Sequence, residues 1–178
     1  MRNWRLLVAI VLISAMAGVG WVYAQGRGGS NTLTGQDIAE IERLYARYTQ
    51  GLDFQDEELY LSAWADDAVF TTGGGEVWAG TEALRRRFRQ GGRPEGGEGV
   101  TITHNNTSIL IGATEEGAKG RAYWIVLDTS EPEPRMMLHG HYFDTFVRTP
   151  EGWRIKTRGS MRGWSRTRWA TESRSTAF

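Results

Sequence analysis

The chain has no cysteine, only four prolines among its 178 residues, and no excess of charge of either sign. The lack of cysteine excludes a disulfide framework and thiolate chemistry, so a hydrophobic core must hold the fold together. The lack of net positive charge argues against nucleic acid as the main partner. The sequence also contains no glycine-rich phosphate loop, no serine nucleophile elbow and no paired carboxylates of the hydrolase kind.

Aromatic residues are plentiful instead, with eight tryptophans, six tyrosines and six phenylalanines. Each of these side chains buries a large area in a core. Aromatic side chains also line the cavities that bind small apolar ligands. The composition therefore favours a small molecule over nucleic acid as the partner.

The N-terminal residues have the order of a signal peptide. Arg2 and Arg5 precede an apolar run over residues 6–19, and small residues follow up to Ala24. This order predicts a cleavable signal over residues 1–24, a periplasmic or secreted protein, and no membrane partner after cleavage. The alternative is an uncleaved anchor, but the run is shorter than the ~20 residues that a spanning helix needs.

Cleavage near Ala24 would leave about 154 residues, which suffices for one domain with a core. Residues 25–33 are rich in glycine and serine and are expected to form a flexible linker. Residues 34–164 form the predicted domain. Residues 165–178 are a polar tail with arginine and tryptophan, for which disorder is the default and a lid over a cavity is the alternative.

Helical spacing of apolar residues predicts three helices in the first half of the domain. The first covers residues 35–50 and ends at Gly51, with Thr34 and Asp37 forming its capping box. The second begins after Asp56 and ends at Asp66. The third covers residues 81–89, and its three consecutive arginines are expected to face solvent.

The second half has the alternating pattern of strands. A short strand over residues 68–72 turns back as a hairpin with residues 76–79, and the glycine-rich residues 91–99 are expected to form a mobile loop. Short connections make the later strands antiparallel. Helices followed by a long sheet indicate the α+β class. The four later strands are predicted over residues 100–112, 120–128, 136–148 and 152–158.

One of these strands is apolar on both faces. Tyr123 and Ile125 alternate with Trp124 and Val126. Because successive side chains of a strand point to opposite faces, one face is expected to meet the helices. The other is expected to meet a second subunit, which predicts a homodimer.

Four short motifs are spread over the predicted domain. They are Tyr48-x-x-x-x-Asp53, Thr103-His104-Asn105, Gly140-x-Tyr142-x-Asp144 and Gly152-Trp153-Arg154-Ile155. In these motifs the chain resembles the SnoaL-like branch of the nuclear transport factor 2-like superfamily, with its scytalone dehydratase-like and bile acid dehydratase-like members. This resemblance implies a cone of three N-terminal helices packed in a strongly bent antiparallel sheet that encloses a cavity.

The resemblance implies that Asp53, His104 and Tyr48 are catalytic. A neutral imidazole can remove an acidic C–H proton and return it to a leaving hydroxyl, while a carboxylate supports the imidazolium. A nearby phenol would polarise a carbonyl. The alternatives are a loop or capping acid for Asp53, a satisfied core histidine for His104 and a core aromatic for Tyr48.

The resemblance further implies that Arg158, Asp144, Tyr123 and Trp124 line or brace the pocket and bind substrate. For Arg158 and Asp144 the alternative is one structural ion pair. The chain departs from the scytalone dehydratase-like pattern at one place. Where that group has a second catalytic histidine, this chain offers Tyr123 or Trp124.

His139 and His141 raise a separate hypothesis. Residues i and i+2 of a strand project from one face about 7 Å apart, so the two imidazoles could share a metal ion with His104. No nearby carboxylate completes a recognisable motif, and we expect neither a metal nor a cofactor.

Together these observations predict an exported domain that binds a small, largely apolar, oxygenated molecule. The expected chemistry is cofactor-independent dehydration or isomerisation. The alternative is a non-catalytic binding module of the same fold, because fold alone does not assign a reaction.

Overall fold

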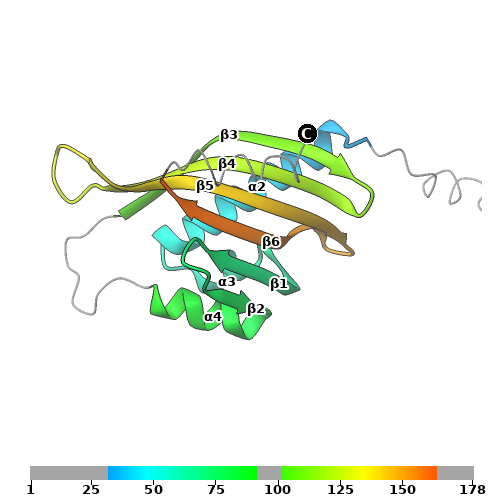
Figure 1. The fold of residues 1–178 in the computed structure, drawn as a ribbon, viewed down its shortest axis with the longest axis horizontal. Helices are drawn as coiled ribbons and strands as arrows, with labels where there is room; N and C mark the ends of the chain where they lie inside the picture. Colours follow the sequence, from blue (N-terminus) through cyan, green and yellow to red (C-terminus); the bar gives the residue numbers. More distant parts are fainter. Residues whose placement is uncertain (1–31, 92–101, 164–178) are drawn as a thin grey trace, which may run out of the picture. The chain divides into compact units, whose positions relative to one another are not determined.

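The computed structural model describes residues 32–91 and 102–163 (Figure 1). The predicted signal peptide, most of the linker, the loop after residue 91 and the tail lie outside these residues. Helices and strands follow one another in the α+β order that the sequence predicts. The helices are α2 (Gly35–Asp53), α3 (Glu57–Leu61) and α4 (Thr81–Gln90), and the strands are β1 (Trp64–Thr72), β2 (Val77–Ala79), β3 (Ile102–Thr114), β4 (Gly117–Asp128), β5 (Arg135–Thr149) and β6 (Gly152–Arg162).

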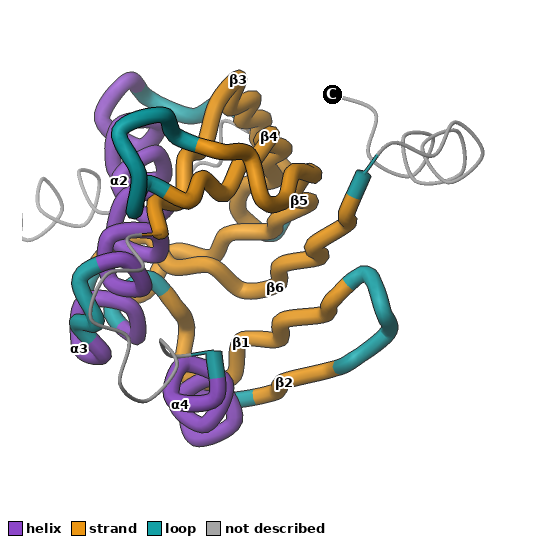
Figure 2. The backbone as a smooth tube through the Cα atoms, turned by 90° about the vertical axis from the view of Figure 1, so that its left-hand side faces the viewer, coloured by secondary structure: helices purple, strands orange, loops and turns teal. Residues whose placement is uncertain are grey.

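The six strands form one curled sheet in the order β2-β1-β6-β5-β4-β3. Strands β3 to β6 pair antiparallel with their neighbours, as their short connections predict. Strand β1 pairs with β6 in parallel, so the sheet is mixed and the prediction of a wholly antiparallel sheet is wrong for this pair of strands. No hairpin joins these two strands, so no tight turn dictates their direction. Figure 2 shows the sheet curling around α2, with α4 beside β1 and β2.

Helix α2 is fixed at its start by the predicted capping box. The Asp37 backbone N–H donates to the Thr34 hydroxyl, and the Thr34 N–H donates to Asp37 Oδ2 at 2.9 Å. Asp37 also receives the Trp153 indole N–H at 2.9 Å and pairs with Arg148. One carboxylate thus ties the N-terminus of α2 to β5 and β6.

Gly51 does not end this helix, which continues to Asp53. Instead, the glycine allows α3 to approach α2 closely. A Cβ atom at Gly51 would lie 2.5 Å from the backbone nitrogen of Tyr60, so only glycine lets α3 pack this tightly against α2. The two additional residues of helix place Asp53 at its last position.

The second helix is shorter than its pattern predicts. It ends at Leu61, and Asp66 and Asp67 lie in β1 rather than after a helix. The buried residues Trp64 and Ala65 continue the apolar stripe, but their backbone belongs to the strand, where Trp64 pairs with Ile155 of β6. Tertiary pairing therefore overrides the helical spacing here.

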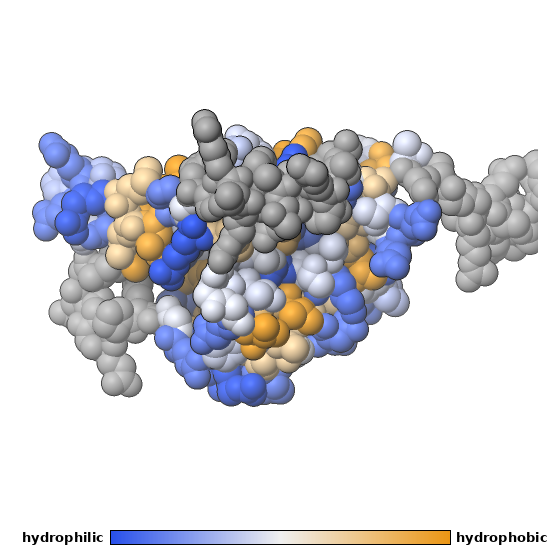
Figure 3. Space-filling model, in the orientation of Figure 1, coloured by the Kyte–Doolittle hydropathy of each residue, from blue (hydrophilic) through white to orange (hydrophobic). Residues whose placement is uncertain are grey.

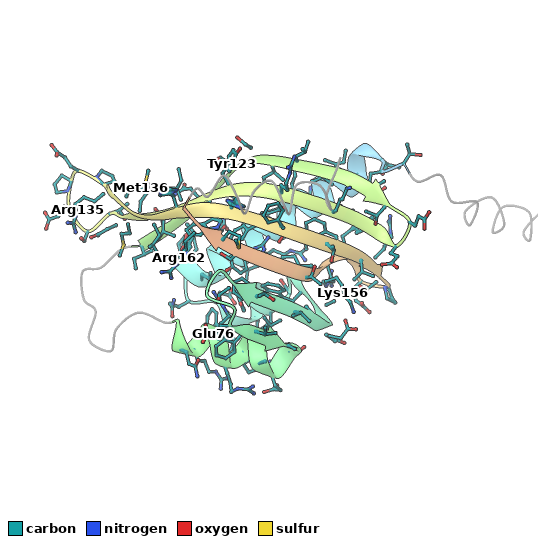
Figure 4. All side chains as sticks on the ribbon, viewed as in Figure 1. Glu76, Tyr123, Arg135, Met136, Lys156 and Arg162 are labelled. Carbon is teal, nitrogen blue, oxygen red and sulfur yellow. The ribbon has the colours of Figure 1, made fainter. Side chains whose placement is uncertain are left out.

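The outer face of the sheet carries apolar side chains that are exposed. Tyr123 and Met136 lie on β4 and β5 (Figure 4), and apolar surface is visible near the start of β5 in the space-filling view (Figure 3). The homodimer through this face stays a prediction. Among residues 32–91 and 102–163, no helix is long and apolar enough to cross a membrane.

Substitution Asp37→Asn should make stability less dependent on pH. Hydrogen bonds from Thr34 and Trp153 hold the pKa of Asp37 well below its ordinary value of 3.8. A lowered pKa stabilises the fold above that value, and the stabilisation is lost as the pH falls below it. Urea unfolding should show the variant about 2 kcal/mol less stable near pH 7, with the difference shrinking below about pH 4. Glu42→Gln, at an exposed position of the same helix, is the control; an equal loss at both sites would contradict this assignment.

Candidate functional site

A cavity of about 670 Å³ opens between α2, the β1–β2 turn, α4 and the ends of β3 and β6. Glu76 on the β1–β2 turn and Arg162 at the end of β6 lie at its exposed rim (Figure 4). Aromatic and apolar side chains form much of its wall. These are Tyr48, Phe70, Trp124, Val126, Leu138 and Tyr142.

Asp53 and His104 meet at this cavity, although they are 51 positions apart in the chain. His104 Nδ1 lies 2.5 Å from Asp53 Oδ1, and the backbone N–H of His104 donates to Asp53 Oδ2 at 2.9 Å. Both carboxylate oxygens of Asp53 therefore contact His104. The contact joins the last residue of α2 to the start of β3.

The orientation of His104 leaves one ring nitrogen for a ligand. An ionised carboxylate only accepts hydrogen bonds, so Asp53 favours the tautomer that carries its proton on Nδ1. Nε2 is then the basic nitrogen. The His104 side chain is 26% exposed and that of Asp53 14%, so a ligand in the cavity can reach the imidazole while bulk water is partly excluded.

Tyr48 lines the cavity from α2 and is only 2% exposed. Its ring packs against Tyr60, Trp64 and Tyr142, with centroids 5.4 to 5.9 Å apart. Burial, and then the neighbouring Tyr48, raise the pKa of Tyr142 well above 10, so Tyr142 keeps its proton at neutral pH. The predicted catalytic residues Asp53, His104 and Tyr48 are thus brought together at one cavity.

Asp144 and Arg158 form a fully buried pair next to this cavity rather than in its lining. Arg158 Nε and Nη2 each donate to an Asp144 oxygen at 2.8 Å. Burial acts to lower the pKa of Arg158, but Asp144 outweighs it and the pKa is raised. The structural ion pair, which was the alternative interpretation, describes these residues better than substrate binding does.

Trp124 and Tyr123 lie on opposite faces of β4. Trp124 lines the cavity and stacks with Tyr142 at 5.9 Å. Tyr123 faces the outer surface and is 38% exposed, so the prediction that it binds substrate in this cavity is wrong. Tyr123 and Trp124 differ in this way because successive side chains of a strand point to opposite faces of the sheet.

The three histidines do not form a metal site. In the β4–β5 register, His139 lies opposite Ile125 and His141 lies opposite Tyr123, so both histidines lie on the outer face of the sheet. His104 instead lines the cavity. Among residues 32–91 and 102–163, no group of three histidine or acidic residues could hold a metal ion. The hypothesis of a three-imidazole site is therefore wrong for this part of the chain.

Arg87 is a cavity residue that the sequence analysis missed. It was expected on a solvent-facing helix surface, but its guanidinium lies 4.0 Å from the Phe70 ring centroid and it lines the cavity. The helical spacing of the sequence could have predicted this inward position. Arg87 follows Leu84 by three positions and precedes Phe88, and both of these are buried.

Comparison with known proteins identifies the domain. A family model described as SnoaL-like domain matches residues 34–159. A search of curated proteins found no match.

Solved structures share the fold at low sequence identity. A nuclear transport factor 2-like protein with a cystatin-like fold from Novosphingobium aromaticivorans has a TM-score of 0.66 and 23% identity, over 76% of this chain and 88% of its own. A cystatin-like protein of unknown function from Nostoc punctiforme has a TM-score of 0.62 and 23% identity, over 75% and 96%. A scytalone dehydratase candidate from Novosphingobium aromaticivorans has a TM-score of 0.58 and 23% identity, over 71% and 84%. At these identities the likeness shows the fold alone.

Substitution Asp144→Asn should strongly destabilise the domain. Removing the carboxylate charge leaves the Arg158 guanidinium buried without its counter-ion, which typically costs about 3–5 kcal/mol. Urea unfolding measures the loss. The matched control is Asp67→Asn, which breaks the exposed pair with Lys156 and should leave the free energy of unfolding nearly unchanged. Similar losses in both variants would show that the buried pair has no special structural role.

Proposed function

We propose that this chain, which belongs to the SnoaL-like domain family, is an acid/base lyase or isomerase. Its substrate is a small, largely apolar molecule with a carbonyl group, bound in the cavity. The observation that supports this proposal is the His104–Asp53 pair, with 2.5 Å between Nδ1 and Oδ1 at the cavity wall.

In the proposed reaction, His104 Nε2 removes a proton from the carbon next to the carbonyl. The electrons of the C–H bond move towards the carbonyl oxygen, and the imidazole becomes an imidazolium that Asp53 stabilises. In a dehydration, the enolate then expels a hydroxyl from the next carbon, and the imidazolium gives its proton to that oxygen. In an isomerisation, the same proton returns to a different carbon.

Tyr48 is the proposed hydrogen-bond donor to the carbonyl oxygen. The Arg158 guanidinium lies 4.5 Å from the centroid of the Tyr48 ring. A nearby positive charge makes a phenol a better donor to an oxygen that becomes negative in the transition state. Arg158 and Asp144 would thus support catalysis by positioning Tyr48 without contacting the substrate.

Export is also part of the proposal. Its support is the basic, apolar and small-residue order of residues 1–24. The protein would act in the periplasm or outside the cell.

Substitution His104→Ala should abolish proton transfer. General acid–base catalysis by one group typically contributes about 10²- to 10⁴-fold to the rate. The measurement is exchange of the α-proton of β-hydroxyketones in D₂O, followed by ¹H NMR, because exchange reports proton removal whatever the final product. Asp53→Asn should also lower the rate, since it weakens support for the imidazolium.

The control for this experiment is His139→Ala, at an exposed position of the outer face. Its exchange rate should equal that of the wild type. If compounds bind the wild type but exchange no faster than in buffer, or if His104→Ala exchanges as fast as the wild type, the chain is a binding module instead.

Expression of the full chain in a bacterial host should yield a shortened protein in the periplasmic fraction. Intact-mass measurement should place the new N-terminus at Gln25, directly after Ala24. A cell-associated protein with residues 1–24 still attached would contradict cleavage.

A further inference from the structure

Arg87 of α4 brings a positive charge into the cavity wall. The side chain is half-buried, and the face of its guanidinium is covered by the Phe70 ring. In the described ranges 32–91 and 102–163, no carboxylate lies within ion-pair distance of it. A partly desolvated guanidinium without a counter-ion is well suited to bind an anion.

The other arginines of α4 are differently placed. Arg85 and Arg89 both pair with Glu57 of α3, and Arg86 is exposed. The carboxylate of Glu57 therefore pairs with arginines on the outer side of α4. Arg87, on the inner side, interacts with the phenol of Tyr60 and pairs with no carboxylate in the described ranges, so its positive charge remains available to a ligand that enters the cavity.

The groups around Arg87 do not neutralise it. It interacts electrostatically with Tyr48, Tyr60 and Tyr142. Burial raises the pKa of Tyr60 and of Tyr142, so both phenols keep their protons and carry no negative charge at neutral pH. Of the two carboxylates that line the cavity, Asp53 is hydrogen-bonded to His104 and Glu76 is exposed at the rim. The inner part of the cavity thus combines the Arg87 cation with apolar and aromatic walls, which matches an organic acid better than a neutral molecule.

We propose that Arg87 binds a carboxylate of the ligand, so that the cavity selects small organic acids with an apolar ring. The planar guanidinium can hold both carboxylate oxygens, while the ring of the ligand packs against Trp124 and Tyr142. This inference rests on the proposed function only in placing the ligand in the same cavity as His104 and Asp53.

A matched pair of probes tests the proposal. 2-Naphthoate and 2-naphthamide have nearly the same shape but differ in charge, and isothermal titration calorimetry on the purified protein gives both dissociation constants. The wild type should bind 2-naphthoate about tenfold more tightly or better. Arg87→Met should remove this preference, while Arg87→Lys, which keeps the charge, should retain part of it.

Two control variants locate the effect. Arg86→Met, one position away on the exposed side, should keep the full preference, which excludes a general effect of helix charge. Arg162→Met, at the exposed rim, should also keep it, and because the titration requires no turnover, a failure of the catalytic proposal would leave this result unchanged. Thermal unfolding checks that each variant is folded.

Three results would overturn the inference. The first is equal affinity of the wild type for the two probes. The second is a preference for 2-naphthoate that survives in Arg87→Met. The third is no binding of either probe at millimolar concentration, since a cavity that selects such acids must accept one of them.

Discussion

The buried guanidinium of Arg158 connects the parts of the domain that surround the cavity. Asp144 holds it from β5, and the rings of Tyr48 and Tyr142 lie 4.5 and 4.1 Å from it. Tyr45 of α2 and Trp64 of β1 complete the surroundings at 4.9 and 5.8 Å. Side chains from α2, β1, β5 and β6 therefore meet at this one guanidinium. Because a buried charge tolerates little displacement from its partner, this contact fixes where α2 lies against the sheet.

The position of α2 in turn determines the candidate site. Gly51 allows the close approach of α3, and two residues later the helix ends at Asp53, facing His104 on β3. A hydrogen bond of 2.5 Å between residues so far apart in sequence requires that both backbones be placed by the core. The geometry of the candidate site is thus a consequence of packing around Tyr48 and Arg158.

Local signals in the sequence predicted the features that depend on neighbouring residues. The Thr34–Asp37 capping box and the antiparallel order of the later strands are of this kind, and family resemblance correctly paired Asp53 with His104. Features decided by tertiary contacts were predicted wrongly. Gly51 looks like a helix stop but serves a close contact, and Arg87 looks solvated but faces a cavity that no local pattern reveals.

The distribution of charge around the cavity bears on how a ligand would be chosen. Glu76 and Arg162 lie at the exposed rim, where water and salt screen their fields, so they contribute little to discrimination between ligands. Asp53 is already engaged by His104 through both oxygens. Arg87 differs because it is half-buried beside aromatic rings, where the dielectric response is weaker and a charge acts more strongly. An imidazole–carboxylate pair can move protons on many substrates, so it does not select a ligand. Selectivity between ligands must therefore come from the rest of the cavity wall. In that wall, Arg87 is the group with the strongest preference for one class of ligand.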